Sequence, residues 1–504
     1  MFKNALISVS DKTGLVEFLK PYVAKGLRVV STGGTLKVLR EAGIPAIEVS
    51  EQTGFPEVMD GRVKTLHPRV HMSLLARLGN PEDDALLKKE KLEAFDLVIV
   101  NLYPFETALK KGLVEDELIE FIDIGGPSML RAAAKNHDRL AVVCEPEDYH
   151  WIAQKTELTL ADRRRLAARV YRHTARYDDL IAKTLAPEED RPVTLVGSLV
   201  SELRYGENPH QKAWWFKKPE NKTGLHDAAI LHGKALSFNN ILDLEAAVST
   251  VREFKGPAAV AVKHNNPCGV GTDLESVTVA VRRSIQADPV SVFGGIIALN
   301  RTVDLASAEE MAKIFLECII APDFTSEALA RLQKKKDLRL LRWPEMLVEV
   351  ADKQFRCVSG GFLVQTADQT TDWSEDWRVI GKAPPENIKN DLLLAWKVCA
   401  HLKSNAIAIA SHGCTLGLGM GQVNRVDAVE QAVTRMQRHH PDFGEPCLAS
   451  DAFFPFPDSV EVAAKAGVRW VIQPGGSIRD EEVIARAAEL GVTMVMTGRR
   501  HFRH

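Results

Sequence analysis

From Ala5 to about Val143 the chain alternates short β-rich runs with helical runs, and this order constrains the fold more than any other feature. The β-rich runs are ALISVS (5–10), LRVVST (27–32), AFDLVIVNL (94–102) and DRLAVVC (138–144). Strands that alternate with helices in this way form a parallel sheet whose two faces are covered by helices. We therefore expect a doubly wound α/β domain that binds its ligand at the carboxyl ends of the strands.

Beyond about Asp190 the pattern becomes mixed, and a chain of 504 residues suggests roughly two to four domains. The acidic, proline-bearing stretch LAPEEDRPVT (185–194) is the best candidate linker, so we expect domains at 1–190 and 195–504. A weaker break near 368–385 would divide the second part into two related α/β units, although only their order of elements is similar. The strand-like runs of this part are AAVAV (258–262), SVFGGIIALN (291–300), NAIAIAS (405–411), RWVIQ (469–473) and TMVMTG (493–498).

Acidic and basic residues nearly balance, with 67 Asp and Glu against 64 Lys and Arg and a formal charge of -3. No global field therefore favours nucleic acid or an anionic membrane, and an anionic ligand must be held locally. Neither a secretory signal nor an apolar run of roughly 18 residues is evident, which predicts a cytoplasmic protein. The seven cysteines are scattered without a C-x-x-C spacing, and we interpret them as free thiols.

Two strand ends in the first part carry residues suited to a phosphate monoester. In SVSDKTG, Ser10 or Asp11 would cap the next helix and Lys12 would stand at its positive end. In VSTGGT, Gly33 and Gly34 would let backbone N–H groups approach an anion. Further donors there are the hydroxyls of Ser31, Thr32 and Thr35. Each stretch alone also fits an ordinary cap or turn, and GG without a third spaced glycine is no dinucleotide fingerprint.

Three more stretches of the first part carry polar groups near expected strand or helix ends. GRVKTLHP (61–68) contains Arg62, Lys64 and His67, although a solvated basic loop would look the same. NLYPF (101–105) holds Tyr103 before a proline, which favours an extended backbone there. IDIGGPSMLRAAAKNH (122–137) places Asp123 before a Gly-Gly-Pro helix start and Lys135 near the end of that helix. Taken alone, Asp123 is equally well explained as a capping residue.

In the second part, AVAVKHNNPCGVG (259–271) ends an apolar run in two adjacent basic residues, Lys263 and His264. Neighbouring side chains on a strand point to opposite faces, so both reach one substrate only if the chain turns there, as Asn-Pro soon after suggests. A histidine beside a cation suits proton transfer. A strand-end histidine with a solvated lysine is the alternative. The H-x-E and P-C-x-x-C ligand sets of zinc nucleobase deaminases are missing, which argues against zinc-dependent deamination.

These motifs resemble, in this order, a bifunctional purine-biosynthesis family. That family joins phosphoribosylaminoimidazolecarboxamide (AICAR) formyltransferase to inosine monophosphate (IMP) cyclohydrolase. The resemblance implies a methylglyoxal-synthase-like first domain and two cytidine-deaminase-like subdomains, acting as a homodimer with transferase sites at the subunit interface. It implies formyl transfer from 10-formyltetrahydrofolate to AICAR without a metal, giving FAICAR, and then dehydrative closure to IMP. The resemblance is carried by SVSDKTGL, STGGT, GRVKTLHP, NLYPF, IDIGGPSMLRAAAKNH, LRYGENPHQ, KHNNPCG, GQVNRVDA, DAFFPFPD and TGRRHFRH.

Residue by residue, the resemblance implies two centres. The cyclohydrolase residues would be Lys64, Tyr103, Asp123 and Lys135, and the transferase pair would be Lys263 and His264. Around the first nucleotide would lie Ser10, Lys12, Ser31, Thr32, Gly33, Gly34, Thr35, Arg62, Thr65, Asn101 and Gly125. The second nucleotide and the folate would contact Arg204, Tyr205, Gly294, Glu317, Asn405, Arg425, Phe453, Asp458, Gly475, Gly476 and Arg500. On chemistry alone, Arg204 and Arg425 would pair with phosphate, and Phe453 would stack on a flat ring, unless FFPF is core.

One departure and two rival functions stay open at this point. Where the family carries paired glycines after His71, this chain has Met72 and Ser73, whose bulk would alter packing beside Lys64. The first domain would also suit a non-catalytic nucleotide sensor. The second part would also suit a degenerate deaminase that serves as a scaffold.

Overall fold

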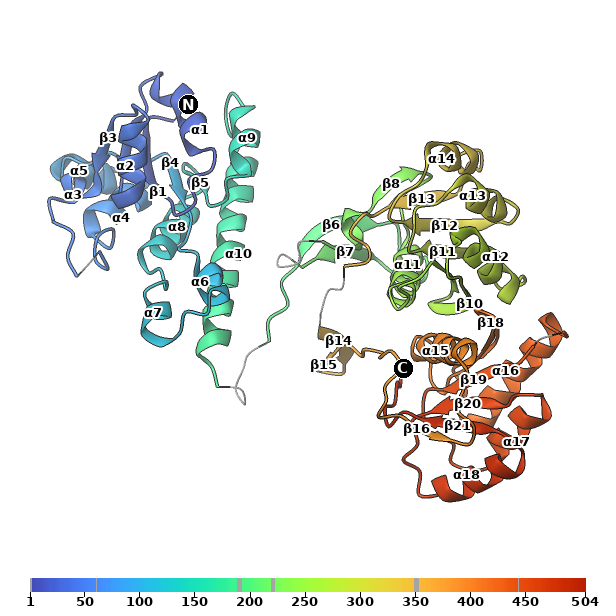
Figure 1. The fold of residues 1–504 in the computed structure, drawn as a ribbon. Helices are drawn as coiled ribbons and strands as arrows, with labels where there is room; N and C mark the ends of the chain where they lie inside the picture. Colours follow the sequence, from blue (N-terminus) through green and yellow to red (C-terminus); the bar gives the residue numbers. More distant parts are fainter. Residues whose placement is uncertain (1, 60, 188–192, 219–222, 349–352, 443) are drawn as a thin grey trace. The chain divides into compact units, whose positions relative to one another are not determined.

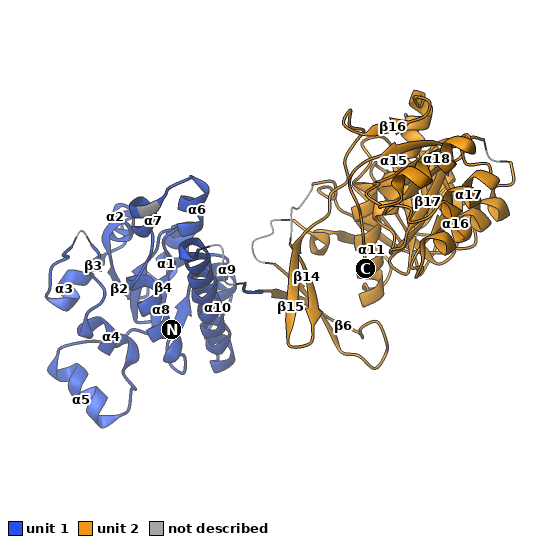
Figure 2. Cartoon of the chain, turned by 90° about the horizontal axis from the view of Figure 1, so that it is seen from below, with its two compact units in different colours: residues 1–196 blue, residues 197–504 orange. Residues whose placement is uncertain are grey.

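The computed structural model describes residues 2–59, 61–187, 193–218, 223–348, 353–442 and 444–504. These residues form two compact units, Met1–Val196 and Gly197–His504 (Figure 2). The predicted linker begins at the last residue of a long helix that ends at Leu185, and its residues 188–192 lie outside the described ranges. Among the described helices, none is both long and apolar enough to span a membrane.

The first unit is built on a five-stranded parallel sheet of order β3-β2-β1-β4-β5 (Figure 1). The chain order reverses beside β1, and parallel sheets bind ligands at such a point. Apolar residues alternate along β1, with Leu6 packed in one core and Ile7 in the core on the opposite face. The predicted doubly wound sheet is confirmed. The strands are β1 (Asn4–Ser8), β2 (Arg28–Ser31), β3 (Ala46–Glu48), β4 (Leu97–Val100) and β5 (Ala141–Val143).

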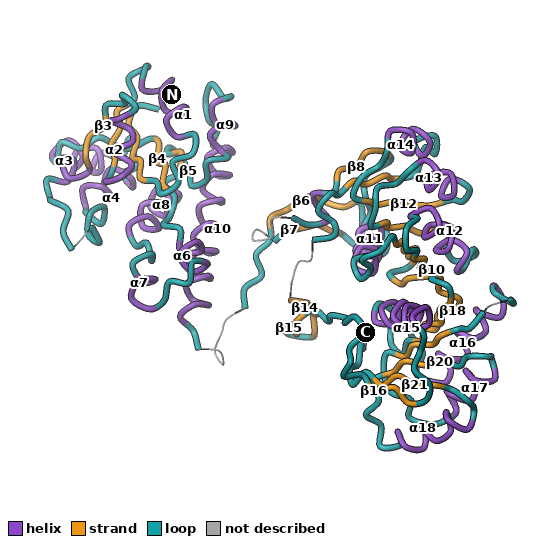
Figure 3. Tube along the Cα trace, viewed as in Figure 1, coloured by secondary structure: helices purple, strands orange, loops and turns teal. Residues whose placement is uncertain are grey.

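Helices cover both faces of this sheet, as the alternating pattern predicts (Figure 3). They are α1 (Leu15–Val23), α2 (Gly33–Glu41), α3 (Val49–Thr53), α4 (Pro68–Leu75), α5 (Pro81–Lys89), α6 (Phe105–Lys110), α7 (Glu115–Ile119), α8 (Gly125–Lys135), α9 (Asp148–Ala153) and α10 (Leu160–Leu185). The prediction that Ser10 or Asp11 caps α1 is wrong. Gly14 precedes α1 without a side-chain cap, and Asp11 instead accepts hydrogen bonds from the backbone and hydroxyl of Thr13.

The second unit contains a twelve-stranded mixed sheet of order β16-β21-β20-β19-β17-β18-β10-β9-β11-β12-β13-β8. Two hairpins lie outside this sheet, β6 (Ser198–Leu203) with β7 (Ala213–Lys217) and β14 (Lys353–Val358) with β15 (Gly361–Thr366). The sheet strands are β8 (Ala229–His232), β9 (Ala258–Lys263), β10 (Asn266–Thr272), β11 (Gly295–Leu299), β12 (Leu316–Ala321), β13 (Arg339–Arg342), β16 (Arg378–Ile380), β17 (Ile407–Ser411), β18 (Cys414–Gly419), β19 (Cys447–Ser450), β20 (Trp470–Gln473) and β21 (Thr493–Met496).

Helices again cover both faces of the large sheet. Helices α11 and α15 share one core, whereas α12–α14 and α16–α18 pack in two separate cores on the other face. Their bounds are α11 (Phe238–Val251), α12 (Val277–Ala287), α13 (Leu305–Ala312), α14 (Ser326–Leu332), α15 (Glu386–Ala400), α16 (Arg425–His439), α17 (Asp458–Lys465) and α18 (Asp480–Glu489), with a 3-10 turn, η2, at Leu225–Asp227.

The two halves of the large sheet repeat the same topology. From its edge inward, one half runs β8-β13-β12-β11-β9-β10 and the other runs β16-β21-β20-β19-β17-β18, and they meet where β10 pairs with β18. Close packing is repeated too. A Cβ on Gly269 or Gly271 of β10 would lie 2.1 or 2.2 Å from backbone of α12, and one on Gly417 or Gly419 of β18 would lie 2.0 Å from backbone of α16. The two related α/β units are therefore joined in one continuous sheet.

Candidate functional site

A cavity of about 650 Å³ opens in the first unit at the carboxyl ends of β1, β2 and β4 and at the starts of α2 and α8. The structure brings most of the predicted first-unit residues to this cavity. Those that line it are Ser10, Lys12, Thr32, Gly33, Gly34, Thr35, Arg62, Lys64, Thr65, Asn101, Tyr103, Asp123 and Gly125. The doubly wound fold thus places the site where a parallel sheet reverses its strand order.

One end of the cavity has the features of a phosphate cradle. Helix α2 begins at Gly33, after an extended Thr32, so its unpaired N–H groups and positive dipole end face an incoming anion. Thr35 fixes this end, because its Oγ1 accepts the Val9 N–H at 2.9 Å. Asn101 on the loop after β4 accepts the Ser10 N–H at 2.6 Å and so ties the β1 loop to it.

Lys64 supplies the principal cation beside the cradle. Its Nζ lies 2.6 Å from an oxygen of Glu57, and the Lys64 side chain is only 17% exposed. Gly33 has a φ of 41°, and a Cβ there would lie 3.1 Å from the Lys64 Nζ, so a side chain at this position would be strained and would crowd the ammonium. Arg62 is paired with Glu120.

The cavity wall also contains Asp123, just before α8, and Tyr103, just before α6. Asp123 Oδ1 accepts the Gly126 N–H at 2.8 Å, and the Asp123 N–H donates to the Tyr177 hydroxyl at 2.7 Å. That hydroxyl donates in turn to the Phe121 carbonyl at 2.7 Å, so α10 holds this loop. Burial raises the pKa of Asp123 above its ordinary value. Burial, and then the nearby Asp123 and Glu57 carboxylates, also raise the pKa of Tyr103. The wall therefore holds two groups suited to moving protons.

Two predicted residues of the first unit do not line the cavity. Ser31 is buried, and its hydroxyl donates to the Ile7 carbonyl at 2.8 Å, so it bridges two strands. Lys135 is exposed at the last residue of α8, roughly 15 Å along the helix from Gly125. The expected effect of the Met72 and Ser73 substitutions on Lys64 also has no support in the packing. Met72 packs on a small cluster around Leu87, Ser73 is buried, and neither lines the cavity.

In the second unit, Lys263 and His264 lie at a tight hairpin. Lys263 ends β9 and pairs with Asn266, which begins β10, so the loop consists of His264 and Asn265 alone. These two residues have φ values of 53° and 62°, the left-handed pair of a type I′ turn. The predicted turn is confirmed. Lys263 Nζ donates to the Phe293 carbonyl at 2.8 Å, next to the predicted residue Gly294.

Arg425, which the sequence analysis predicts to pair with phosphate, is buried. Its guanidinium pairs with the fully buried Asp451 and donates to the Asn405 side-chain oxygen at 2.8 Å. The Asn405 side-chain nitrogen, Nδ2, donates to the Gln422 carbonyl at 2.9 Å. Arg425 therefore orients Asn405.

The remaining predicted residues of the second unit are distributed over several loops. Arg204 stacks on the Tyr205 ring at 4.8 Å, and Arg500 stacks on Phe502 at 4.4 Å. Glu317 pairs with Arg339 at 3.0 Å. Phe453 is 36% exposed, whereas its neighbour Phe454 is fully buried, so FFPF is core in part. Asp458 begins α17. Gly475 and Gly476 line a second cavity, of about 720 Å³, and Lys263 and His264 are not among its lining residues.

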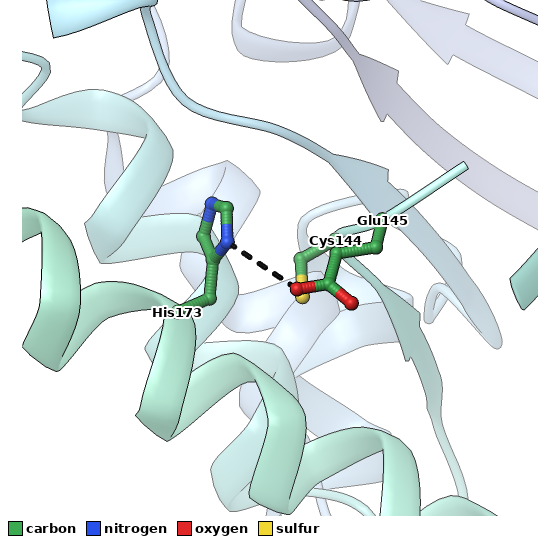
Figure 4. Close-up of side chains that lie close together, drawn as sticks. All are labelled: Cys144, Glu145 and His173. Atoms are coloured by element: carbon green, nitrogen blue, oxygen red, sulfur yellow. Dashed lines mark ion pairs between the residues drawn. The ribbon is translucent and has the colours of Figure 1, made fainter. Parts of the chain in front are cut away.

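The described residues hold one group with donors suited to a metal ion, namely Cys144, Glu145 and His173 (Figure 4). Their candidate ligand atoms all lie within 4.8 Å of one another. Burial raises the pKa of the Cys144 thiol, and the Arg169 guanidinium already lies 3.7 Å from Glu145 and 2.5 Å from Asp148. A metal ion there would have to displace a proton and oppose a fixed cation. None of these residues lines the first cavity.

The sequence analysis does not identify several residues of the two candidate sites, because each lies far along the chain from the residue that it contacts. Glu57 pairs with Lys64, Tyr177 holds the Asp123 loop, and Asp451 anchors Arg425. None of the three stands in a stretch with a local signal of its role. Asp243, which bonds the hairpin turn beside His264, is a fourth.

The chain is similar to known proteins along its whole length. A family model described as "AICARFT/IMPCHase bienzyme" matches residues 133–435, and one described as "MGS-like domain" matches residues 14–128. The "Bifunctional purine biosynthesis protein PurH" of Bacillus mycoides (strain KBAB4) is 50% identical over 516 residues, which cover 100% of both chains. The protein of the same name from Bacillus subtilis (strain 168) is 50% identical over 517 residues, covering 100% of this chain and 99% of its own.

Among solved structures, the chain is 30% identical to the protein of a structure titled "Crystal structure of ForH". That match covers 36% of this chain and 95% of the other, with a TM-score of 0.32. The family assignment therefore rests on the sequence relatives and the family models.

Proposed function

This chain belongs to the AICARFT/IMPCHase bienzyme family, and we propose that its two units divide the last two steps of IMP synthesis between them. The first step moves a formyl group from 10-formyltetrahydrofolate to the 5-amino group of AICAR, giving FAICAR. The second step closes FAICAR to IMP with loss of water. We assign ring closure to Met1–Val196 and formyl transfer to Gly197–His504.

One observation carries the assignment of ring closure: a single cavity joins a phosphate cradle at α2 to Lys64, Tyr103 and Asp123. With the nucleotide phosphate at the cradle, the carboxamide nitrogen attacks the formyl carbon and a carbinolamine forms. The Lys64 ammonium and the N–H groups at the start of α8 stabilise its oxygen. Asp123 and Tyr103 move the protons that ring closure and loss of water require.

The family resemblance also implies a part for Lys135 in ring closure. Its side chain is exposed at the far end of α8, so within one chain the proposed chemistry rests on Lys64, Tyr103 and Asp123. The Lys135→Ala variant measures its contribution directly. FAICAR that accumulates in this variant would support a role for Lys135, and normal IMP formation would remove it from the proposal.

Formyl transfer rests on Lys263 and His264 at the β9–β10 turn. Neutral His264 accepts the proton of the AICAR amino group as that nitrogen attacks the formyl carbon. The Lys263 ammonium stabilises the oxyanion or protonates the departing N10 of the folate. This chemistry needs no metal, and binding both substrates in one site supplies the remaining advantage. The proposed binding residues are Arg204, Tyr205, Gly294, Glu317, Asn405, Phe453, Asp458, Gly475, Gly476 and Arg500, with Arg425 acting through Asn405.

The proposal includes a homodimer that works in the cytoplasm. Exposed apolar side chains on both extra hairpins support an interface, because monomers rarely leave large apolar patches in water. They include Leu199, Trp214 and Phe216 on β6–β7 and Phe362 and Leu363 on β14–β15. The seven cysteines are free thiols, which suits a reducing compartment.

Incubation of the purified chain with AICAR and 10-formyltetrahydrofolate, without added metal, tests the proposed function. Chromatography over time should show IMP and free tetrahydrofolate in equal amounts. FAICAR without IMP would reduce the first unit to a nucleotide sensor. Absence of any product would favour the scaffold interpretation of the second unit.

A further inference from the structure

In each half of the second unit, a carboxylate on the preceding helix binds the backbone of a hairpin turn. In the first half, Asp243 of α11 accepts the Asn265 N–H at 2.6 Å. In the second half, Asp391 of α15 accepts the His412 and Gly413 N–H groups, each at 2.8 Å. In both halves a carboxylate on the helix before the hairpin therefore accepts backbone N–H groups of a two-residue turn, two in the second half and that of Asn265 in the first, and we call this contact the clamp.

The two turns match in conformation as well as in contacts. His412 and Gly413 have φ values of 52° and 72°, and Ser411 pairs with Cys414 across that turn, as Lys263 pairs with Asn266 across the first. The interval along the chain is constant. Asp243 and Asp391, His264 and His412, Gly269 and Gly417, and Gly271 and Gly419 are equally spaced in the numbering. The clamp thus belongs to a sequence repeat that only the structure makes visible.

The residues that flank the two turns differ in chemistry. The first turn presents Lys263 and His264, and the residue before the second turn is the buried Ser411. Residues other than glycine are uncommon in the left-handed conformation, so a partner that fixes it stabilises each turn. In the first half the clamp therefore holds the two side chains on which formyl transfer depends, and in the second half it holds a turn without that lysine.

We propose that Asp243 is the positioning residue of the transferase pair. Its carboxylate holds the His264–Asn265 turn in the left-handed conformation, and thereby sets the direction in which the imidazole projects beside Lys263. Asp243 does not itself touch the reacting atoms. The proposal rests on the proposed roles of Lys263 and His264, and it adds a residue from α11 to that centre.

The test compares Asp243→Ala, Asp243→Asn and the matched control Asp391→Ala in the full-length chain. Assays of formyl transfer give kcat and KM for AICAR. In each variant, ring closure of supplied FAICAR shows whether the first unit is still active. For Asp243→Ala we expect kcat to fall about 100-fold while KM stays within about threefold, because misplacing a reacting group by 1 Å has this effect. Asp243→Asn keeps an oxygen that accepts an N–H, so we expect kcat within about tenfold of the parent.

Asp391→Ala separates positioning from a merely structural role. It removes the same clamp from the other half, so we expect a similar loss of Tm with transfer kcat within about threefold of the parent. The proposal is overturned if Asp243→Ala keeps the parental kcat, or if Asp391→Ala lowers kcat as much. Should Asp243→Ala fail to fold, Asp243→Glu replaces it, since it keeps the charge and displaces the carboxylate. A parental kcat in Asp243→Glu would likewise overturn the proposal.

The variants His264→Ala and Asp243→Ala/His264→Ala distinguish this proposal from the proposed function. If Asp243 acts through His264, the double variant transfers formyl no more slowly than His264→Ala. A further loss in the double variant would contradict the positioning role. Transfer at the parental rate in His264→Ala would instead refute the proposed catalytic pair itself.

Discussion

The ammonium of Lys64 and the carboxylate of Glu57 form an ion pair of 2.6 Å inside the cavity of the first unit. Lys64 lies next to Gly33 of the phosphate cradle, and Glu57 balances its charge. Tyr103 and Asp123 line the same cavity.

Lys64→Ala should lower the rate of ring closure by roughly 10²–10³-fold, because it removes the donor that we propose stabilises the developing oxyanion. Formyl transfer should be unchanged, since Lys64 belongs to the other unit. The matched control is Lys37→Ala, whose lysine is exposed on α2 and pairs only weakly with Glu41. Conversion of supplied FAICAR to IMP measures the effect. Equal rates for the two variants would exclude the role of Lys64.

Asp123→Asn should stabilise the first unit while abolishing ring closure. Burial raises the Asp123 pKa above its ordinary 3.8, so the folded state binds this proton more tightly than the unfolded chain. Ionising Asp123 therefore weakens the fold, and this cost appears as the pH rises from 3.8 through the folded pKa. Asparagine keeps an oxygen for the Gly126 N–H without the charge. In denaturant unfolding, the advantage of the variant should be larger at pH 7.5 than at pH 4.5, and a constant difference would contradict the assignment.

His264→Ala should reduce formyl transfer by at least roughly 10²-fold, because it removes the proposed base, while AICAR binding and ring closure persist. The matched control is His412→Ala, which changes the equivalent turn in the other half of the second unit. That variant should transfer formyl at the parental rate. Steady-state kinetics with AICAR as the varied substrate compares the two, and a similar loss in both would point to turn stability as the cause.

Arg425→Met should destabilise the second unit by about 3–5 kcal/mol, because it leaves the buried Asp451 carboxylate without its cation. Asn405 loses its orienting donor at the same time, so formyl transfer should also fall. Ring closure by the first unit should persist. Denaturant unfolding monitored in parallel with both activities tests this, and an unchanged unfolding midpoint for the second unit would show that the pair contributes little.

The elements of both units could be predicted from sequence because their signals are local. The apolar runs ALISVS and AAVAV are strands, and the STGGT stretch reaches the cavity as its chemistry indicates. Residues whose role depends on a distant partner could not be predicted. Glu57 meets Lys64 only through a folded loop, and Tyr177 reaches Asp123 from a helix more than fifty residues away.

Arg425 and Lys135 lie in surroundings that their sequence positions do not indicate. Arg425 has the chemistry of a phosphate ligand, but its side chain is 5% exposed and pairs inside the protein. Lys135 ends the helix that begins just after Asp123, and the rise of α8 separates the two residues. The internal repeat escaped notice because few residues are identical between the halves. Those that are include Asp243 and Asp391, whose shared task is visible only in hydrogen bonds.

The most direct test of two separate centres is a complementation assay with His264→Ala and Lys64→Ala, each incubated with AICAR and 10-formyltetrahydrofolate, alone and mixed. The account predicts formylation slowed at least roughly 10²-fold in His264→Ala, FAICAR that accumulates ahead of IMP in Lys64→Ala, and rapid IMP formation in the mixture, because FAICAR released by one variant is closed by the other. IMP at the parental rate from His264→Ala alone, or IMP formation in the mixture no faster than in either variant alone, would contradict the division of the two reactions between the units.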